Sequence, residues 1–199
     1  MESSVSFSTS IETARKYGAY VRSFFEELES TFLPASTASL NRQQVERIIN
    51  SFDGTLEKSR NDKCAKCNSK VGPNDTYVKK LTDNGRFSIH IPSKYLSNND
   101  EDLPYIRAIF ELGHGLLHLI SDEYPVGTIM CYTSGGALKL EAAAFAREMI
   151  MPKHAFEAVA AKHLSKGCIY NVEGIIVEYK AQNDKEYIIG RGKELRFWR

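Results

Sequence analysis

The first quarter of the chain contains two stretches in which hydrophobic residues recur every three or four positions. One covers residues 11–28 and the other covers residues 40–52. Side chains at this spacing share one face of a helix, so both stretches predict amphipathic helices that pack on a core. Ser8, Thr9 or Ser10 can cap the first helix, because a side-chain oxygen there accepts a hydrogen bond from an unpaired backbone amide.

The pattern changes to short alternating runs in the middle of the chain. Residues 53–75 are polar and rich in Asn, Asp, Lys and Gly, and we predict a loop there. Residues 77–81 and 86–91 then alternate, with Asn84-Gly85 between them. Both residues of an Asn-Gly pair tolerate positive φ, so these two runs predict a β-hairpin.

Helical spacing returns in the second half of the chain. A long helix is predicted after Pro104, a second across residues 137–151, and a third from Pro152 to Gly167. A short run at residues 126–132 is suited to an edge strand.

The tail, residues 171–198, is compatible with two structures. Its apolar positions fit two short helices on either side of residues 182–184. Its β-branched residues also fit a hairpin of residues 174–181 against residues 187–190.

Length and charge narrow the class of protein. A chain of 199 residues forms one domain, or one domain with a small appendage. The net charge of +1 provides no general attraction to nucleic acid or to an anionic membrane. No segment is apolar over the length that a bilayer requires, and the start lacks the features of a secretory signal. We therefore expect a cytoplasmic protein that does not bind membranes.

Four cysteines, Cys64, Cys67, Cys131 and Cys168, are expected to be thiols or metal ligands in that compartment. Cys64 and Cys67 have the spacing of half a zinc knuckle, but a structural zinc ion needs two more ligands. A loop with two free thiols is therefore the expected state. Cys131 lies between the two helices that carry the candidate site.

The residues with the most chemical content lie on the long helix after Pro104, in the run Phe110-Glu111-Leu-Gly-His114. Helical zinc sites use H-E-x-x-H, because residues four apart lie about 40° apart around the axis and can share one ion. The Glu faces the metal-bound water as a general base, and a carboxylate from a following helix completes the ligands. Glu111, His114 and Glu141 fill the positions of the base, the second ligand and the third ligand. Phe110 stands where the first ligand is expected.

These motifs resemble the ImmA/IrrE family of metallo-endopeptidases. The runs RAIFELGHGLLHL and KLEAAAFAREMIMP are similar to that family's HELGHxxLH helix and to the ExEAxxFAxxLLMP helix that follows it. The run FSIHIPSKYLSNND resembles the strand and loop before the active-site helix, and residues 171–198 resemble a C-terminal helix pair. The resemblance covers residues 76–198 and leaves residues 1–75 outside it.

The resemblance implies an α+β, zincin-like fold that is mostly helical, with a small antiparallel β-sheet packed on the active-site helix. It divides the chain into residues 1–75, an N-terminal helical segment with the CxxC loop, and residues 76–199, a metallopeptidase domain that ends in a helix pair. In the tail it favours helices over the hairpin. Position by position, it implies that His114 and Glu141 are Zn²⁺ ligands and that Glu111 is the catalytic base.

Three interpretations of Phe110 compete. In the first, which is slightly favoured, the site is inactive and Phe110 fills the space of the imidazole and the metal. In the second, the metal shifts one turn to His114 and His118, with Glu141 as the third ligand, although no Glu follows His114 to act as base. In the third, Phe110 is a change in an otherwise active parent. The resemblance places His118 at the LH position after the motif, which implies a structural role or the support of a metal ligand.

Two further groups are expected to be structural. His90, His154 and His163 are predicted to be ordinary surface or edge residues. Basic residues gather in the tail and suggest nucleic-acid binding. The apolar positions between them are expected to pack on the core, which leaves the charges in solvent, so direct binding of nucleic acid is not expected.

The leading functional hypothesis is a zinc metallo-endopeptidase of the ImmA/IrrE type, or its inactive descendant. The resemblance implies cleavage of a DNA-binding repressor of a phage or mobile element, so the expected partner is a transcriptional repressor. The alternative is a non-catalytic module that sequesters a peptide, a repressor or a toxin. Zn²⁺ is the expected cofactor of a working site, and an inactive site needs none.

Overall fold

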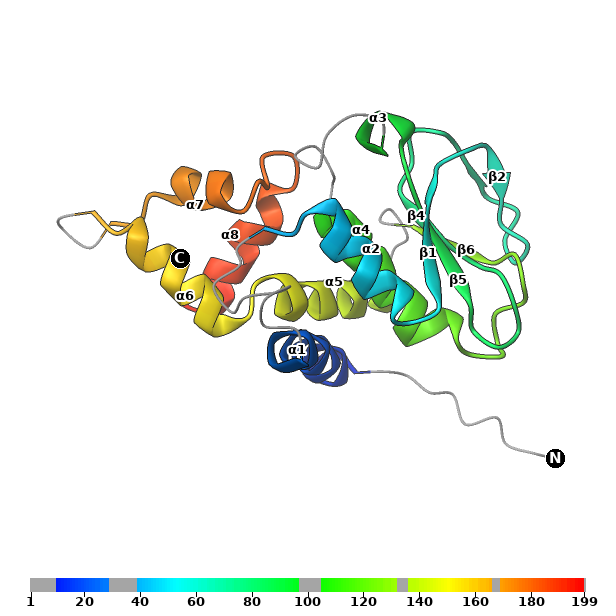
Figure 1. Ribbon diagram of the computed structural model, residues 1–199, viewed down its shortest axis with the longest axis horizontal. Coiled ribbons are helices and arrows are strands. Elements are labelled where there is room, and N and C mark those ends of the chain that lie inside the picture. Colours follow the sequence, from blue (N-terminus) through cyan, green and yellow to red (C-terminus); the bar gives the residue numbers. More distant parts are fainter. Residues whose placement is uncertain (1–9, 29–38, 97–104, 132–135, 166–168, 199) are drawn as a thin grey trace.

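The computed structural model describes residues 10–28, 39–96, 105–131, 136–165 and 169–198. The strands gather at one end of the molecule and the helices of the tail gather at the other (Figure 1). Helices outnumber strands among these residues, so the prediction of a mostly helical α+β protein is confirmed.

Two capped helices open the described chain, as the hydrophobic spacing predicts. Helix α1 (Ile11–Leu28) begins after Ser10, whose hydroxyl accepts from the amide three residues later at 3.1 Å. Helix α2 (Arg42–Asn50) begins with a capping box in which Asn41 and Gln44 each accept from the other's backbone amide.

Four strands form the main sheet: β1 (Gly54–Lys58), β4 (Tyr77–Lys80), β5 (Phe87–Ile91) and β6 (Ile129–Cys131). Their order is β1-β5-β4-β6. β5 pairs in parallel with β1 and antiparallel with β4, and β4 pairs antiparallel with β6. The sheet is therefore mixed, and the prediction of an antiparallel sheet was wrong.

The cause of that error is the segment predicted to be a loop. Residues 53–75 contain β1 and a two-stranded antiparallel ribbon of β2 (Asp62–Lys63) and β3 (Lys70–Val71). β1 is largely polar and lacks a clear alternation, so its sequence does not indicate a strand. It is a strand because the backbone of β5 supplies its hydrogen bonds, which a local pattern cannot reveal.

The predicted hairpin of β4 and β5 is confirmed, and so is the edge position of β6. The turn differs from the expected one, because Gly85 has a positive φ of 85° whereas Asn84 is not among the described residues with positive φ. Thr82 closes the turn instead: its carbonyl accepts from the amide of Gly85 at 3.2 Å and its hydroxyl accepts from the amide of Arg86 at 3.2 Å. The result is a longer turn with glycine at its left-handed position.

The second half of the described chain is helical apart from β6. The tail forms two helices, so the hairpin considered there was wrong. The long helix after Pro104 begins as α-helix and ends in a π-helical segment, η2. The elements are α3 (Ser93–Leu96), α4 (Tyr105–His114), η2 (Gly115–Leu119), α5 (Ala137–Ile150), α6 (Lys153–Lys162), α7 (Val172–Glu178) and α8 (Lys185–Glu194).

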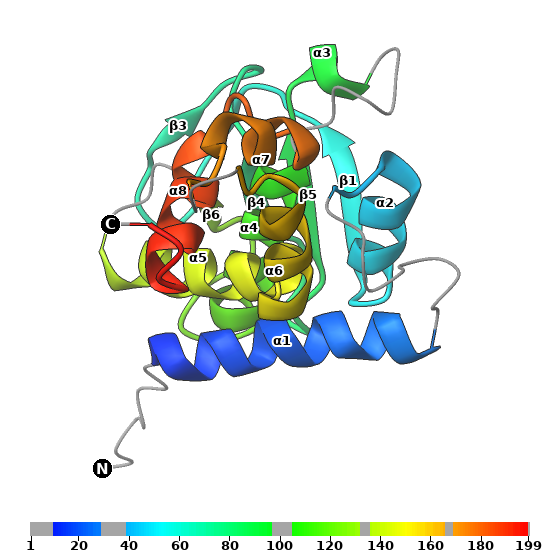
Figure 2. The same ribbon diagram turned by 90° about the vertical axis from the view of Figure 1, so that its left-hand side faces the viewer.

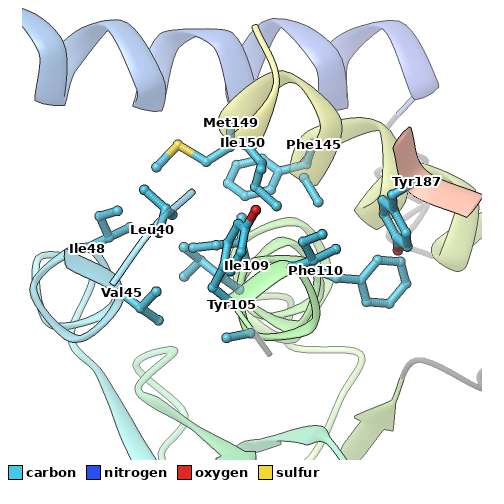
Figure 3. Packing of buried hydrophobic residues seen from close by; sticks show 14 of the residues in the cluster. Leu40, Val45, Ile48, Tyr105, Ile109, Phe110, Phe145, Met149, Ile150 and Tyr187 are labelled. Atoms are coloured by element: carbon cyan, nitrogen blue, oxygen red, sulfur yellow. The ribbon is translucent and has the colours of Figure 1, made fainter. Parts of the chain in front are cut away.

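Helix α4 lies at the centre of the hydrophobic core. Figure 3 shows its side chains between Val45 and Ile48 of α2, the apolar face of α5, and Tyr187 of α8. Helix α1 packs across α5 (Figures 1 and 2), where the rings of Tyr17 and Phe145 lie 5.9 Å apart. The core thus joins side chains from both halves of the chain. The division at residues 75 and 76 stays a prediction.

Polar contacts fix the tail against α4 and α5. The Tyr105 hydroxyl donates to the carbonyl of Tyr179, and Arg107 donates to Asp184 at 2.9 Å. The buried Arg191 donates to both carboxylate oxygens of Glu148, at 2.8 and 2.7 Å. These contacts bring α8 to the side of α4 that carries Phe110. None of the described helices combines the length and the apolar character needed to cross a membrane.

Candidate site on helices α4 and α5

The core of the candidate site is a carboxyl–imidazole pair on α4. Glu111 and His114 lie three positions apart, so both side chains project from one side of the helix. The Nδ1 atom of His114 is 2.9 Å from a carboxylate oxygen of Glu111, and both side chains are 0% exposed. An ionised Glu111 can only accept, so Nδ1 then carries the proton and Nε2 keeps a free lone pair.

A second pair joins the end of that helix to α5. His118 lies in the π-helical segment η2, and its Nε2 atom is 3.5 Å from a carboxylate oxygen of Glu141. The rings of His114 and His118 have centroids 6.0 Å apart. A π-turn contains more residues than an α-turn, so the angle between His114 and His118 around the axis differs from that in a regular α-helix.

Phe110 packs directly on His114. Its ring meets the ring of His114 edge to face, with centroids 4.6 Å apart, and meets Tyr187 of α8 at 6.2 Å. Phe110 is 0% exposed. Figure 3 shows it pointing from α4 toward Tyr187, so the space on this side of His114 is filled by two aromatic rings.

Burial keeps both histidines neutral near pH 7. It lowers the pKa of His114 to about 4, and the positive charge of Lys139 acts in the same direction. It also lowers the pKa of His118 to about 4, assisted by His114 and opposed by a hydrogen bond with the backbone of Leu138. Burial raises the pKa of Glu141. The imidazoles therefore present lone pairs rather than charges.

These lone pairs are what a metal ion would use. The Nε2 atoms of His114 and His118 are buried and have no hydrogen-bond partner within the described part of the chain. Burying two nitrogen atoms without hydrogen-bond partners destabilises the fold, unless a proton donor or a metal ion satisfies their lone pairs.

The donor set does not fit a three-ligand zinc site. Across residues 10–28, 39–96, 105–131, 136–165 and 169–198, no three His, Cys, Asp or Glu side chains group so that they could hold a metal ion. The predicted site residues instead form two pairs, Glu111 with His114 and His118 with Glu141. A catalytic zinc site also needs an open position for water, whereas Glu111 and His114 are closed to solvent.

Sequence reasoning missed two neighbours of this site. Tyr187 reaches Phe110 from the tail, and no local signal marks a contact between residues so far apart in sequence. Lys139 acts on His114 through its charge, and its place two residues before Glu141 was the only available hint.

The remaining histidines divide into surface and core residues. His154 is exposed, as predicted, and lies 3.3 Å from Glu26. His163 is partly exposed and is 2.8 Å from Glu178. His90 was predicted wrongly, because it is 0% exposed and stacks on Tyr77 with centroids 4.4 Å apart. The β2–β3 ribbon covers that face of the sheet, and the ribbon was not predicted.

Cys64 and Cys67 are free thiols in the loop between β2 and β3, as expected. No third metal ligand joins them within the described ranges. Cys168 and the side chain of Cys131 lie outside the described residues.

One comparison with known proteins gives a match. Residues 78–167, from β4 to just after α6, match the family model Peptidase_M78, described as the IrrE N-terminal-like domain. The segment is somewhat under half of the chain and contains both motif helices. It supports the resemblance to the ImmA/IrrE family and a metallopeptidase-like fold there. No curated protein and no solved structure matches the chain.

Proposed function

We propose that this protein is a catalytically inactive relative of the ImmA/IrrE peptidases, with a zincin-like fold, that acts by binding a protein partner. The observation that carries the proposal is the position of Phe110. It occupies the place of the first H-E-x-x-H ligand, and its buried ring fills the space beside His114. A phenyl ring offers no lone pair to a cation, so the ligand set is short of a member.

The contacts of Glu111 support the same conclusion. A general base must reach the water that it deprotonates. Glu111 is instead engaged with the Nδ1 atom of His114 and shielded from solvent. The carboxylate then serves to hold the imidazole, which is a structural use of a residue that the motif assigns to catalysis.

The proposed partner is a transcriptional repressor, because the resemblance implies repressors as the targets of this family. A protein that retains the scaffold and lacks the metal would capture such a repressor without cutting it. This proposal includes a cytoplasmic location, where a repressor is available, and no bound zinc at the motif.

A second candidate function rests on the two buried Nε2 atoms of His114 and His118, which have no hydrogen-bond partner among the described residues. His114, His118 and Glu141 together supply two imidazoles and a carboxylate, the donor types of a catalytic zinc site. These three side chains do not group as ligands in the described part of the chain, so they would have to move to share one ion. The protein would then be a zinc enzyme whose ligands lie one turn further along the helix.

Zinc titration of the full-length protein separates the two candidates. The titration is done calorimetrically in a Cys67→Ser background, which removes the exposed thiol. We expect no stoichiometric binding with Phe110 in place and about one zinc ion per chain after Phe110→His, which restores the three ligands of the motif. Phe110→Leu is the matched control, since it alters the same buried position without adding a donor. Zinc bound with Phe110 intact, and lost on His118→Gln, would overturn the proposal in favour of the shifted site.

A candidate repressor tests the binding role directly. The expected result is co-elution of repressor and protein from a sizing column, with the repressor's mass unchanged. Cleavage of the repressor that disappears on Glu111→Gln would contradict a non-catalytic role.

A further inference from the structure

The loop that carries Cys64 and Cys67 is a closed and well-ordered turn. The ribbon of β2 and β3 frames it, with Lys63 opposite Lys70. Inside the turn, the amide of Cys64 donates to the carbonyl of Ser69 at 2.9 Å, and the amide of Asn68 donates to the carbonyl of Cys64 at 2.9 Å. Asn68 adopts a positive φ of 61°, which an asparagine tolerates. These two bonds close a turn that contains both cysteines, three positions apart.

Cys67 is the accessible member of the pair. Its side chain is exposed, and its sulfur lies 3.0 Å from the hydroxyl of Ser69. Hydrogen bonds from the Ser69 side chain, from the Ser69 backbone and from the thiol of Cys64 lower the pKa of Cys67. Thiolates form in surroundings of this kind.

Cys64 is the protected member of the pair. It is 1% exposed and packs with Val71, Tyr77 and Ile129. Its sulfur accepts a hydrogen bond from the amide of Ile129 at 3.3 Å. An external reagent cannot reach this sulfur without opening the loop, whereas Cys67 lies three positions away in the same turn. The two thiols therefore differ in access to solvent.

We propose that Cys64 and Cys67 form a redox-active dithiol, which a low-molecular-weight disulfide oxidises to an intramolecular disulfide. The thiolate of Cys67 attacks one sulfur of the small disulfide, RSSR. A mixed disulfide forms, and one RS⁻ leaves and takes a proton. Cys64 then gives up its proton and, as thiolate, attacks the sulfur of Cys67. This attack breaks the mixed disulfide and displaces the second RS⁻, which takes a proton and leaves as RSH. The protein loses two protons and two electrons, and RSSR gains them as two RSH.

The alternative use of such a pair is to bind a thiophilic metal. A structural zinc ion needs four donors, and no group of three candidate ligands occurs in the described part of the chain. Two thiols with unequal access match the requirements of thiol exchange, which needs one attacking sulfur and one resolving sulfur. The dithiol proposal does not depend on the proposed function of the helical site.

The experiment places the reduced full-length protein in mixtures of reduced and oxidised glutathione, followed by alkylation, proteolysis and mass spectrometry. The expected product is the peptide containing Cys64 and Cys67 lighter by two hydrogens and unreactive to the alkylating reagent. In Cys64→Ser, the mixed disulfide with glutathione should accumulate on Cys67, since no resolving thiol is present. In Cys67→Ser, Cys64 should stay reduced because it is buried.

A Cys131→Ser/Cys168→Ser protein is the matched control and should give the same intramolecular disulfide as the unaltered chain. Cys67→Ser changes an exposed position, so this variant is expected to fold, which circular dichroism can verify. It therefore keeps the test valid if Cys64→Ser is unstable. Two outcomes would overturn the proposal. One is a Cys64–Cys67 peptide that remains reduced in oxidised glutathione alone. The other is a reduced pair that binds zinc stoichiometrically and is thereby protected from oxidation.

Discussion

The helical site and the cysteine loop both carry side chains that can act as bases, nucleophiles or metal ligands, but they differ in solvent exposure. On α4, Glu111 and His114 are closed to solvent and bonded to each other. In the loop after β2, Cys67 is exposed beside a buried Cys64. The motif that suggests catalysis most strongly lies in the core, whereas the cysteine pair with the spacing of half a zinc knuckle has one exposed thiol. Access and neighbours, more than residue type, decide which groups can react.

The strongest test of this comparison is to empty the space beside His114. Phe110→Ala removes a fully buried ring, so we expect a loss of about 3–5 kcal/mol in the free energy of unfolding. Urea denaturation measures this change in the free energy of unfolding. A loss below ~1 kcal/mol would mean that the ring packs loosely and that the site is not part of the core.

Acid should weaken the helical site. The pKa of His114 is about 4 in the folded protein, against 6.5 for an unperturbed imidazole in the unfolded chain. The unfolded state therefore binds a proton first, and the stabilising contribution is complete above pH 6.5 and lost as pH falls toward 4. By pH 5 the loss due to this residue should be on the order of 2 kcal/mol.

Urea midpoints at pH 7 and pH 5 provide the measurement, with His114→Gln as the matched variant. The variant should lose less stability over this interval than the unaltered protein. Equal losses in the two proteins would show that His114 titrates normally.

The cysteine loop should respond to substitution in the opposite way. Cys67→Ser alters an exposed side chain, so the free energy of unfolding should change by less than ~0.5 kcal/mol. The same substitution abolishes disulfide formation if the dithiol proposal holds. A large loss of stability would place Cys67 in the packed structure and remove the contrast between the two regions.

The most local expected effect concerns one backbone amide. In the reduced protein the amide of Ile129 donates to the sulfur of Cys64. A disulfide sulfur is a weaker acceptor, so oxidation should speed hydrogen exchange at Ile129 by about fivefold, the equivalent of ~1 kcal/mol. NMR-detected exchange can resolve this residue. Unchanged exchange in the fully oxidised protein would show that the bond contributes little.

Local spacing predicts the helices of this protein well, because each helix makes its own hydrogen bonds and needs only one apolar face. The same spacing correctly places Glu111 and His114 on one side of α4. It fails for β1, whose hydrogen bonds come from β5, more than thirty positions later in the register that pairs Gly54 with Phe87. A strand of this kind has no signature of its own.

The parts of the site that could not be predicted are long-range in the same sense. Tyr187 meets Phe110 only because α8 is held against α4 and α5 by contacts such as that of Arg191 with Glu148. The π-helical geometry at His118 also has no sequence signal here. A π-turn holds more residues than an α-turn, so two residues four positions apart are related by a different angle around the helix axis.

The parallel pairing of β1 with β5 has a consequence for any shortened form of the protein. All five residues of β5 are buried, and β1 covers its outer edge. A fragment that began at residue 76 would lack β1 and would expose a strand with apolar side chains and unpaired backbone groups. Such an edge recruits strands from other molecules, so the fragment should self-associate and precipitate. β1, whose polar sequence does not indicate a strand, thus protects the edge of β5 from aggregation.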